Sequence, residues 1–567
     1  MIKNNINFNE IKYERLDYDK TKKSVEELIS KLIKCDNYNE YLELVKEIIK
    51  IQNHIEEMFD YADINNMRNV EDKFFVEEIK YWNENKVKYD SLFLPFYNEL
   101  NNSKYKEELK GILPDNFFRI IEYQARVTSD EISDLVAKEN DLMMQCRKLN
   151  LAKLNYDGEE KTIGKISADY SNKDREVRKK AHDFVNDYYY SNQEEYDQIL
   201  FELVQVRNDI ARKLGFKNCV EYSIYKLKRF DYDYSDISKF RNNIIKYIIP
   251  ICKQLTEWKK EELGLDELKY YDTVYFTEMP KPKYEGIELL EHLRDSFKEA
   301  DEELSNLYNF MLENGYIDFV TRDTKVNFSI TNYLTETCIP VVTGNYKGTY
   351  FDVKTTTHEI GHSLQKYCAS KEDKNRIVSA LLKYPTMEVA EIFSYAMEFI
   401  MMDHLDNIFS EEDYKKYCFM KMYNFITDLP QRCLVDEFQQ TIYSKEDLKV
   451  EDIRKTWLEL AHKYNMDNTY DGHINLSTGG SFYGVSHIYY NPFYFIDYAL
   501  ACCDALSIWN ECDKNIDLFK EIGGVASYYS FKELIEKYNM PNPFEEDTVK
   551  EVSIKLQKEL ENKRIVK

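Results

Sequence analysis

The chain has 567 residues, a formal net charge of −25 and an isoelectric point near 5.0. Because no basic stripe is available to meet phosphate groups, we expect no nucleic-acid partner. Hydrophobic residues make up 43% of the chain, which excludes general disorder and indicates a large core. No segment approaches the roughly 18 consecutive apolar residues that span a bilayer, so we expect no membrane partner.

The cysteines indicate a reducing compartment. They number 11, an odd count, and include no Cys-x-x-Cys pair, so they form no recognisable disulfide or zinc-ribbon framework. The first ten residues also lack the apolar segment of a secretory signal. We therefore expect a cytoplasmic protein.

Helical periodicity dominates the chain from its N-terminus. Residues 20–60 and 70–110 carry apolar side chains three and four positions apart, as amphipathic helices do. A break is expected at 111–114, where glycine and proline occur together, and turns with a short hairpin near 155–158. These patterns predict a mainly α protein.

The chain contains only 11 prolines and 16 glycines, so no flexible linker marks a domain boundary. Changes in pattern instead suggest three approximate parts, with the few strands in the last. They are an N-terminal helical part at 1–155, a middle helical part at 156–335 and a third part at 336–567.

The third part begins with two expected strands. Residues 338–353 are rich in β-branched and aromatic types bounded by glycines, which predicts two short strands with a turn near 346–348. An exposed strand edge can pair with an extended peptide, which makes Gly344, Asn345 and Tyr346 candidates for peptide binding. The alternative is a hairpin that only braces the next helix.

Residues 357–367 contain a His-Glu-x-x-His motif. On a helix, His358 and His362 lie four positions apart on one face, while Glu359 is turned by about 100°. Two imidazoles can then bind one metal ion beside a carboxylate, which is typical of zinc-dependent peptidases. Alternatively, both histidines are ordinary helix residues that hydrogen-bond to backbone or carboxylate groups.

A catalytic zinc ion usually takes three protein ligands and leaves a fourth position open for water. Residues 385–398 predict a helix with a strongly apolar face, with Pro385 in its first turn. Glu388 and Glu391 lie near one another on this helix. A carboxylate beside an apolar face needs a positive partner, and a metal ion would be one. The alternative places one or both on the solvated side.

The last segment of interest combines glycines with aromatic residues. Gly479 to Gly484 contains three glycines and is expected to be a mobile loop. His487 follows, then Tyr494 and Tyr498, which lie one turn apart if Pro492 begins a helix. Such side chains are suitable donors to the oxyanion of a peptidase reaction.

The pairing of His-Glu-Ile-Gly-His at 358–362 with residues 387–398 resembles the M3 oligopeptidases, in particular the oligoendopeptidase F and Pz-peptidase-like branch. Residues 8–19, 174–181 and 486–499 are similar to further segments of that family. The resemblance implies a multi-helix metallopeptidase with a small β-sheet near the zinc site and a deep substrate channel. Residues 336–567 would form its catalytic part.

The resemblance also implies a ligand set and a reaction. Glu391 matches the glutamate that opens the family's Glu-x-x-Ser-x-x-x-Glu stretch, so it would bind one Zn²⁺ per chain together with the two histidines. Glu359 would act as general base in cleaving internal bonds of short, unstructured oligopeptides. His487 and Tyr498, favoured over Tyr494, would bind the oxyanion or the substrate carbonyl.

A histidine on a metal usually donates its other ring nitrogen to an acceptor, and Glu388 is the candidate here. Two other functions stay open. A metallocarboxypeptidase would need a positive group for the substrate's free carboxylate, and it could not cut an amidated peptide internally. A non-catalytic peptide-binding protein would keep the fold without turnover.

Overall fold

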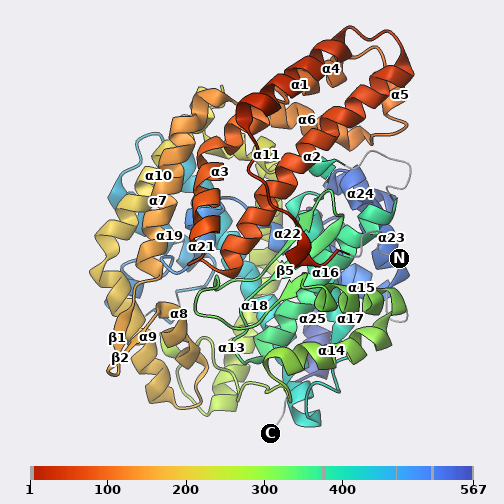
Figure 1. The fold of residues 1–567 in the computed structure, drawn as a ribbon. Coiled ribbons are helices and arrows are strands. Elements are labelled where there is room, and N and C mark those ends of the chain that lie inside the picture. The colour runs from red at the N-terminus through yellow and green to blue at the C-terminus, as the bar shows by residue number, and fades with distance from the viewer. Residues whose placement is uncertain are drawn as a thin grey trace.

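The computed structural model describes residues 6–372, 379–382, 384–467, 469–470, 472–511 and 516–564. These residues form many helices and two small sheets, which confirms the predicted mainly α fold (Figure 1). In the part of the chain so described, no helix is both long and apolar enough to cross a membrane.

The N-terminal helices form one end of the molecule, drawn in red and orange in Figure 1. Their apolar faces build a hydrophobic cluster of their own from residues between 25 and 121. Pro114 is the N-cap of the last of them, which confirms the predicted break. The helices are α1 (Tyr18–Ile33), α2 (Tyr38–Arg68), α3 (Lys73–Ser91), α4 (Leu94–Asn102), α5 (Lys106–Leu109) and α6 (Asp115–Val127).

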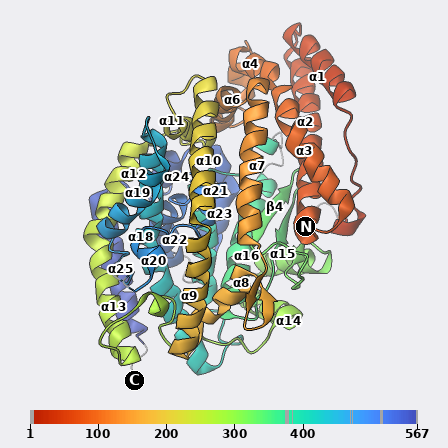
Figure 2. The same cartoon turned by 90° about the vertical axis from the view of Figure 1, so that its left-hand side faces the viewer.

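The middle of the chain is a stack of helices, in which α7 and α10 run side by side (Figure 2). The predicted hairpin is present as β1 (Leu154–Tyr156) and β2 (Glu159–Lys161), joined by Asp157 and Gly158, both with positive φ. The helices are α7 (Ser133–Asn150), α8 (Ile163–Ile166), α9 (Arg175–Ser191), α10 (Gln193–Lys213), α11 (Cys219–Lys226), α12 (Tyr234–Asn243), α13 (Ile249–Leu263), α14 (Gly286–Ala300) and α15 (Glu302–Glu313).

The second sheet has the strand order β3-β5-β4, with β3 (Ile317–Asp318) parallel and β4 (Ile330–Leu334) antiparallel to β5 (Ile339–Thr343). The prediction of two strands within 338–353 was wrong, because β5 is the only strand there and Tyr350 already begins a helix. The partner of β5 comes earlier in the chain. Strand β5 is thus the middle strand of this sheet, and β3 pairs with only its last two residues.

The remaining helices follow this sheet in the chain, and α16 is the one that packs on it. Helix α16 packs against β4 and β5, and also against α17 and α23. The predicted helix is present as α17, but Pro385 precedes its N-cap Thr386 and is not in its first turn; its residues from Glu388 to Met402 are all buried. The helices are α16 (Tyr350–Glu372), α17 (Met387–Met402), α18 (Glu411–Ser444), α19 (Val450–Lys463), α20 (Ile474–Ser477), α21 (Ser486–Tyr490), α22 (Asp497–Glu511), α23 (Asp517–Val525), α24 (Phe531–Lys537) and α25 (Glu546–Asn562).

The crossing of α16 over α17 depends on Gly361. A Cβ built on this glycine would lie 2.6 Å from the carbonyl oxygen of Phe393, 2.8 Å from Met397 Cβ and 2.9 Å from Ser394 Cα. Only glycine permits so close an approach of two helix backbones. The contact lies between His358 and His362 on one helix and beside Glu391 on the other, so it sets the distance between them.

Candidate active site

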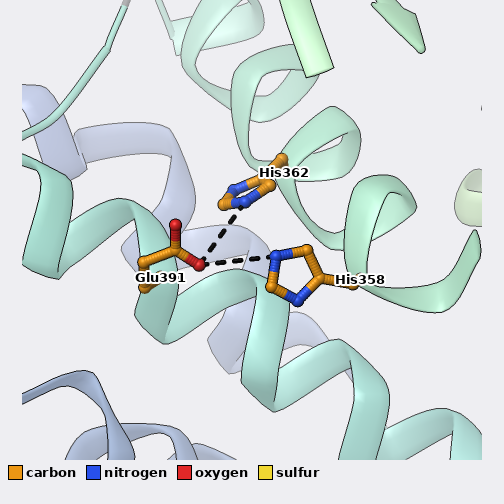
Figure 3. A group of neighbouring side chains, drawn as sticks. All are labelled: His358, His362 and Glu391. Carbon is orange, nitrogen blue, oxygen red and sulfur yellow. Dashed lines mark ion pairs between the residues drawn. The ribbon is translucent and has the colours of Figure 1, made fainter. Parts of the chain in front are cut away.

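Three predicted metal ligands converge between α16 and α17 (Figure 3). Oε2 of Glu391 lies 3.4 Å from His358 Nε2 and 3.7 Å from His362 Nε2. One ligand atom from each residue lies within 4.8 Å of the others, so the group can hold a metal ion. Ligands at about 2.0–2.2 Å from a tetrahedral zinc ion are separated by about 3.3–3.6 Å, and the observed spacing fits this geometry.

Hydrogen bonds hold the Glu391 carboxylate in place. Ser394, one turn along α17, donates its hydroxyl to Oε2 at 2.8 Å, and Tyr494 donates to Oε1 at 2.5 Å. Glu388 and Glu391 are both buried, with 1% exposure for Glu388 and 2% for Glu391. The alternative that either lies on a solvated side is therefore wrong.

His358 is oriented by a residue that the sequence analysis did not select. Its Nδ1 lies 2.7 Å from Oε1 of Glu398, and the other oxygen of Glu398 is ion-paired with Lys421 of α18. Burial alone would raise the pKa of Glu398, but the charges of Lys421 and Lys354 and the interaction with His358 together outweigh it and hold this pKa well below its usual range. A carboxylate can only accept, so Nδ1 carries the hydrogen and Nε2 turns its lone pair toward Glu391.

The prediction that Glu388 accepts a hydrogen bond from a ligand histidine was wrong. Among the described residues, neither of its oxygens has a hydrogen-bond partner of good geometry. Burial and the charge of Asp497 on α22 raise its pKa to about 8. Glu388 thus faces the neighbouring helix instead of the metal ligands. The signal for Glu398 was present in the sequence, since it lies seven positions after Glu391 and so two turns along the same face.

A hydrogen bond from strand β4 holds the side chain of Glu359. Oε2 of Glu359 accepts a hydrogen bond of 2.5 Å from the hydroxyl of Thr331, which stands on β4. The same hydroxyl also lies 3.0 Å from the Glu359 carbonyl oxygen. Burial raises the pKa of Glu359. A buried carboxyl of this kind can take up a proton and release it again.

Comparison with known proteins shows which family the chain belongs to. The model of peptidase family M3 matches residues 170–531, and that of the peptidase M3 N-terminal domain matches residues 8–128. The chain belongs to peptidase family M3. An oligoendopeptidase F homolog from Borreliella burgdorferi is 25% identical over 432 residues, which cover 70% of this chain and 68% of that protein.

Solved structures of this peptidase family share the whole fold. A Pz peptidase A structure determined with an inhibitor has a TM-score of 0.92 and 29% sequence identity, covering 98% of this chain and 99% of that one. A putative oligoendopeptidase F from Bacillus anthracis has a TM-score of 0.88 and 28% identity, covering 98% of both chains. The predicted multi-helix fold with a small sheet is therefore confirmed.

His487, Tyr494 and Tyr498 of the peptidase lie together next to Glu391, but turns and not the predicted helix place them there. Residues 492–496 form turns, with φ of 66° at Phe493, and helix α22 begins only at Asp497. The expected helix from Pro492 was therefore wrong. The turns nevertheless bring the rings of Tyr494 and Tyr498 to 5.0 Å, and both lie 5.8 Å from the imidazole of His487.

The pKa values of His487 and Tyr498 are both shifted from their usual ranges. Burial, together with the charge of Arg432, lowers the pKa of His487 to about 4, so its imidazole is neutral near pH 7. Burial and the nearby Glu391 carboxylate raise the pKa of Tyr498 above its usual range, so its hydroxyl keeps its hydrogen. Both are thus neutral donors. The Tyr494 hydroxyl is already used on Glu391.

The three residues predicted to bind peptide have internal roles instead. A Cβ on Gly344 would collide with the ring of Phe319, and Tyr346 is 4% exposed with its hydroxyl bonded to Thr356. Asn345 donates to the Arg322 carbonyl and accepts from its N–H. These contacts fasten the end of β5 to the preceding segment, so this binding prediction was wrong.

The glycines at 479–484 also have a packing role. Gly479 has φ of +88°, and a Cβ there would collide with the backbone of Arg454 on α19. A Cβ on Gly480 would collide with Asn475, and one on Gly484 would lie 3.2 Å from the Tyr189 hydroxyl. Close approach to three neighbouring elements explains these glycines without a hinge. The prediction of a mobile loop has no support here.

Proposed function

We propose that this M3 peptidase is a zinc-dependent endopeptidase that hydrolyses internal bonds of short, unstructured oligopeptides. One observation carries the proposal: His358, His362 and Glu391 present three ligand atoms within 4.8 Å of one another beside the buried Glu359. Two imidazoles and one carboxylate form a ligand set of the kind that catalytic zinc sites use.

The residues present fit a zinc ion well. His358 directs the lone pair of Nε2 into the group because Glu398 engages its other nitrogen. The bound ion would act as a Lewis acid toward water and the scissile carbonyl. The two histidines and Glu391 already supply the three protein ligands that catalytic zinc usually takes, and Glu388 faces away from them.

Glu359 is proposed to move the proton. It would accept a proton from the attacking water and later donate it to the leaving amine. Its hydrogen bond from Thr331 holds one oxygen, which leaves Oε1 for this exchange. Its raised pKa favours release and uptake nearer to neutral pH than an exposed glutamate would allow.

His487 and Tyr498 are the proposed donors to the developing oxyanion. The hydroxyl of Tyr494 is committed to Glu391, which supports the choice of Tyr498 over Tyr494. His487 is neutral, so it can donate only through the nitrogen that carries hydrogen. A preorganised donor of this kind is worth about 10²- to 10³-fold in kcat.

The test is cleavage of a peptide blocked at both ends. We expect internal cuts by the zinc-loaded protein, seen by mass spectrometry, with zinc near one per chain and loss of both after chelation. An N-acetylated, C-amidated peptide separates the alternatives, because a carboxypeptidase cannot cut it internally. No cleavage of any oligopeptide by the loaded protein would refute the proposal. The cytoplasmic location and the deep substrate channel stay predictions.

A further inference from the structure

Arg432 of α18 is a buried arginine that takes no part in the reaction proposed above. It is 6% exposed and packs against two tyrosine rings, with its guanidinium carbon 5.3 Å from the centre of the Tyr395 ring and 5.4 Å from that of Tyr498. Arg432 Nη1 also donates a hydrogen bond of 3.3 Å to the carbonyl oxygen of Tyr498. The guanidinium therefore contacts both the ring and the backbone of the proposed oxyanion donor.

The charge of Arg432 is only partly compensated. Among the described residues, Asp428 is the one carboxylate that pairs with it, at 3.5 Å from Nη2. The Asp428 side chain is 43% exposed, so solvent weakens this ion pair. Nε of Arg432 is buried and has no hydrogen-bond partner in the part of the chain that the structure describes. Burial of a charge with so few partners costs free energy, and such charges are concentrated at functional sites.

The positive charge of Arg432 acts on both proposed donors. Together with burial, it lowers the pKa of His487 to about 4. It also opposes the rise in the pKa of Tyr498 that burial and the Glu391 carboxylate cause. A hydroxyl beside a cation is a stronger hydrogen-bond donor, and a fixed positive charge stabilises a developing oxyanion most where water is excluded.

Arg432 also connects Tyr498 with the helix that carries Glu391. Tyr395 stands on this helix, α17, and its ring meets the His358 imidazole edge-on at 5.7 Å. The rings of Tyr395 and Tyr498 are 6.3 Å apart and nearly perpendicular, and the guanidinium packs against both. These contacts fix the position of Tyr498 relative to the metal ligands, and such positioning contributes strongly to catalysis.

We propose that Arg432 is a positioning residue for Tyr498. It holds the main chain of Tyr498 against α18 and keeps a positive charge beside its ring while the oxyanion develops. In this role Arg432 acts through the Tyr498 hydroxyl and not on the substrate itself. The inference rests on the proposed function, because it assigns a further residue to the same reaction.

Arg432→Gln removes the charge and keeps a polar side chain. We expect kcat of the zinc-loaded protein to fall about tenfold, which is about 1.4 kcal/mol of the barrier, with KM and zinc content kept. This loss is smaller than the about 10²- to 10³-fold expected for a donor itself, because Arg432 acts through another group. An unchanged kcat would overturn the proposal.

A double-mutant cycle separates this role from a merely structural one. In the Tyr498→Phe background the hydroxyl is absent, so adding Arg432→Gln should lower kcat by less than about twofold. A second tenfold loss in that background would show that Arg432 acts independently of the hydroxyl, and the proposal would then be wrong.

Asp428→Asn tests the sign of the charge at a more exposed position. This change removes the partial compensation of Arg432, so kcat should be kept or should rise. A tenfold fall, equal to that of Arg432→Gln, would mean that the ion pair only packs the helices, which contradicts the proposal. The same variant decides the question if Arg432→Gln does not fold.

The pKa of His487 measures the reach of the charge without turnover. It is followed by NMR in protein labelled with ¹³C at histidine Cε1, with His487→Gln to assign the signal. Arg432→Gln should raise this pKa from about 4 by about 1, the usual scale for a nearby charge. A raised pKa in a protein that cleaves no peptide would refute the peptidase function but support the link between Arg432 and the donors. Cleavage by the wild type together with an unchanged pKa would overturn the proposal and leave the peptidase function intact.

Discussion

Replacement of Gly361 by alanine tests whether the crossing of α16 and α17 sets the metal-ligand spacing. The added Cβ would lie 2.6 Å from the Phe393 carbonyl oxygen and 2.9 Å from Ser394 Cα, whereas ordinary contact begins at 3.4 Å. Both atoms belong to the backbone, so no side-chain rotation relieves the clash. The helices must therefore separate by about 0.8 Å.

The separation carries Glu391 away from the histidines, because Ser394 holds its carboxylate on α17. The gap of 3.4 Å between His358 Nε2 and Glu391 Oε2 then widens to about 4.2 Å, beyond the spacing of a tetrahedral zinc site. We expect zinc affinity to fall about 10- to 100-fold, as when a ligand loses its support. Overpacking lowers the free energy of unfolding by about 1–3 kcal/mol, and the better helix propensity of alanine raises it by about 1 kcal/mol.

The assay is zinc competition with a chromophoric chelator, together with Tm of the metal-free and zinc-loaded protein. Gly523→Ala on α23 is the matched control. Its Cβ would lie 3.5 Å from Gln365 Cα and from the Phe393 ring, which is ordinary contact, so affinity and Tm should be kept. Wild-type zinc affinity and Tm in Gly361→Ala would refute the reasoning.

Three further predictions concern the base, the histidine support and pH. Glu359→Gln should keep zinc near one per chain while kcat falls by several orders of magnitude; loss of the metal or near-normal turnover would remove Glu359 from its role. Glu398→Gln should lower zinc affinity about 10- to 100-fold, measured by chelator competition, and unchanged affinity would contradict its support of the ligand histidine. His54 lies 2.8 Å from both Glu14 and Glu336, and their hydrogen bonds raise its pKa to about 9. Because the folded pKa exceeds the unfolded value of about 6.5, this stabilisation is present below pH 6.5 and is lost as pH rises through 9. Its size is about 1 kcal/mol after solvent screening, so Tm of wild type should exceed that of His54→Gln at pH 6 but not at pH 10, and a gap independent of pH would contradict it.

Features with a local cause were predictable from the sequence. The spacing of His358 and His362 follows from helix geometry, and so does the buried helix that carries Glu391. The same holds for the N-terminal helices, whose apolar residues recur every three or four positions. These patterns depend on neighbours within one or two turns, so no other part of the chain has to be known.

Features that join distant segments needed the tertiary structure. Strand β5 pairs with β3 and β4, which precede it, and the local pattern at 338–353 could not show that β5 is the middle strand of a sheet. Turns, not a helix, bring Tyr494 to Glu391 across 103 positions of sequence. The glycines at 479–484 look like a hinge until the backbone of α19 is seen against them.

The choice between buried carboxylates shows the same division. The sequence by itself determined that a Glu-rich, apolar helix follows the His-Glu-x-x-His motif, because both patterns are periodic along one helix. Only the tertiary structure decided that Glu398 engages His358 while Glu388 faces Asp497, since the answer depends on which side of α17 meets α16 and which meets α22. Helix faces are encoded locally, but the partner of each face is set by packing over the whole chain.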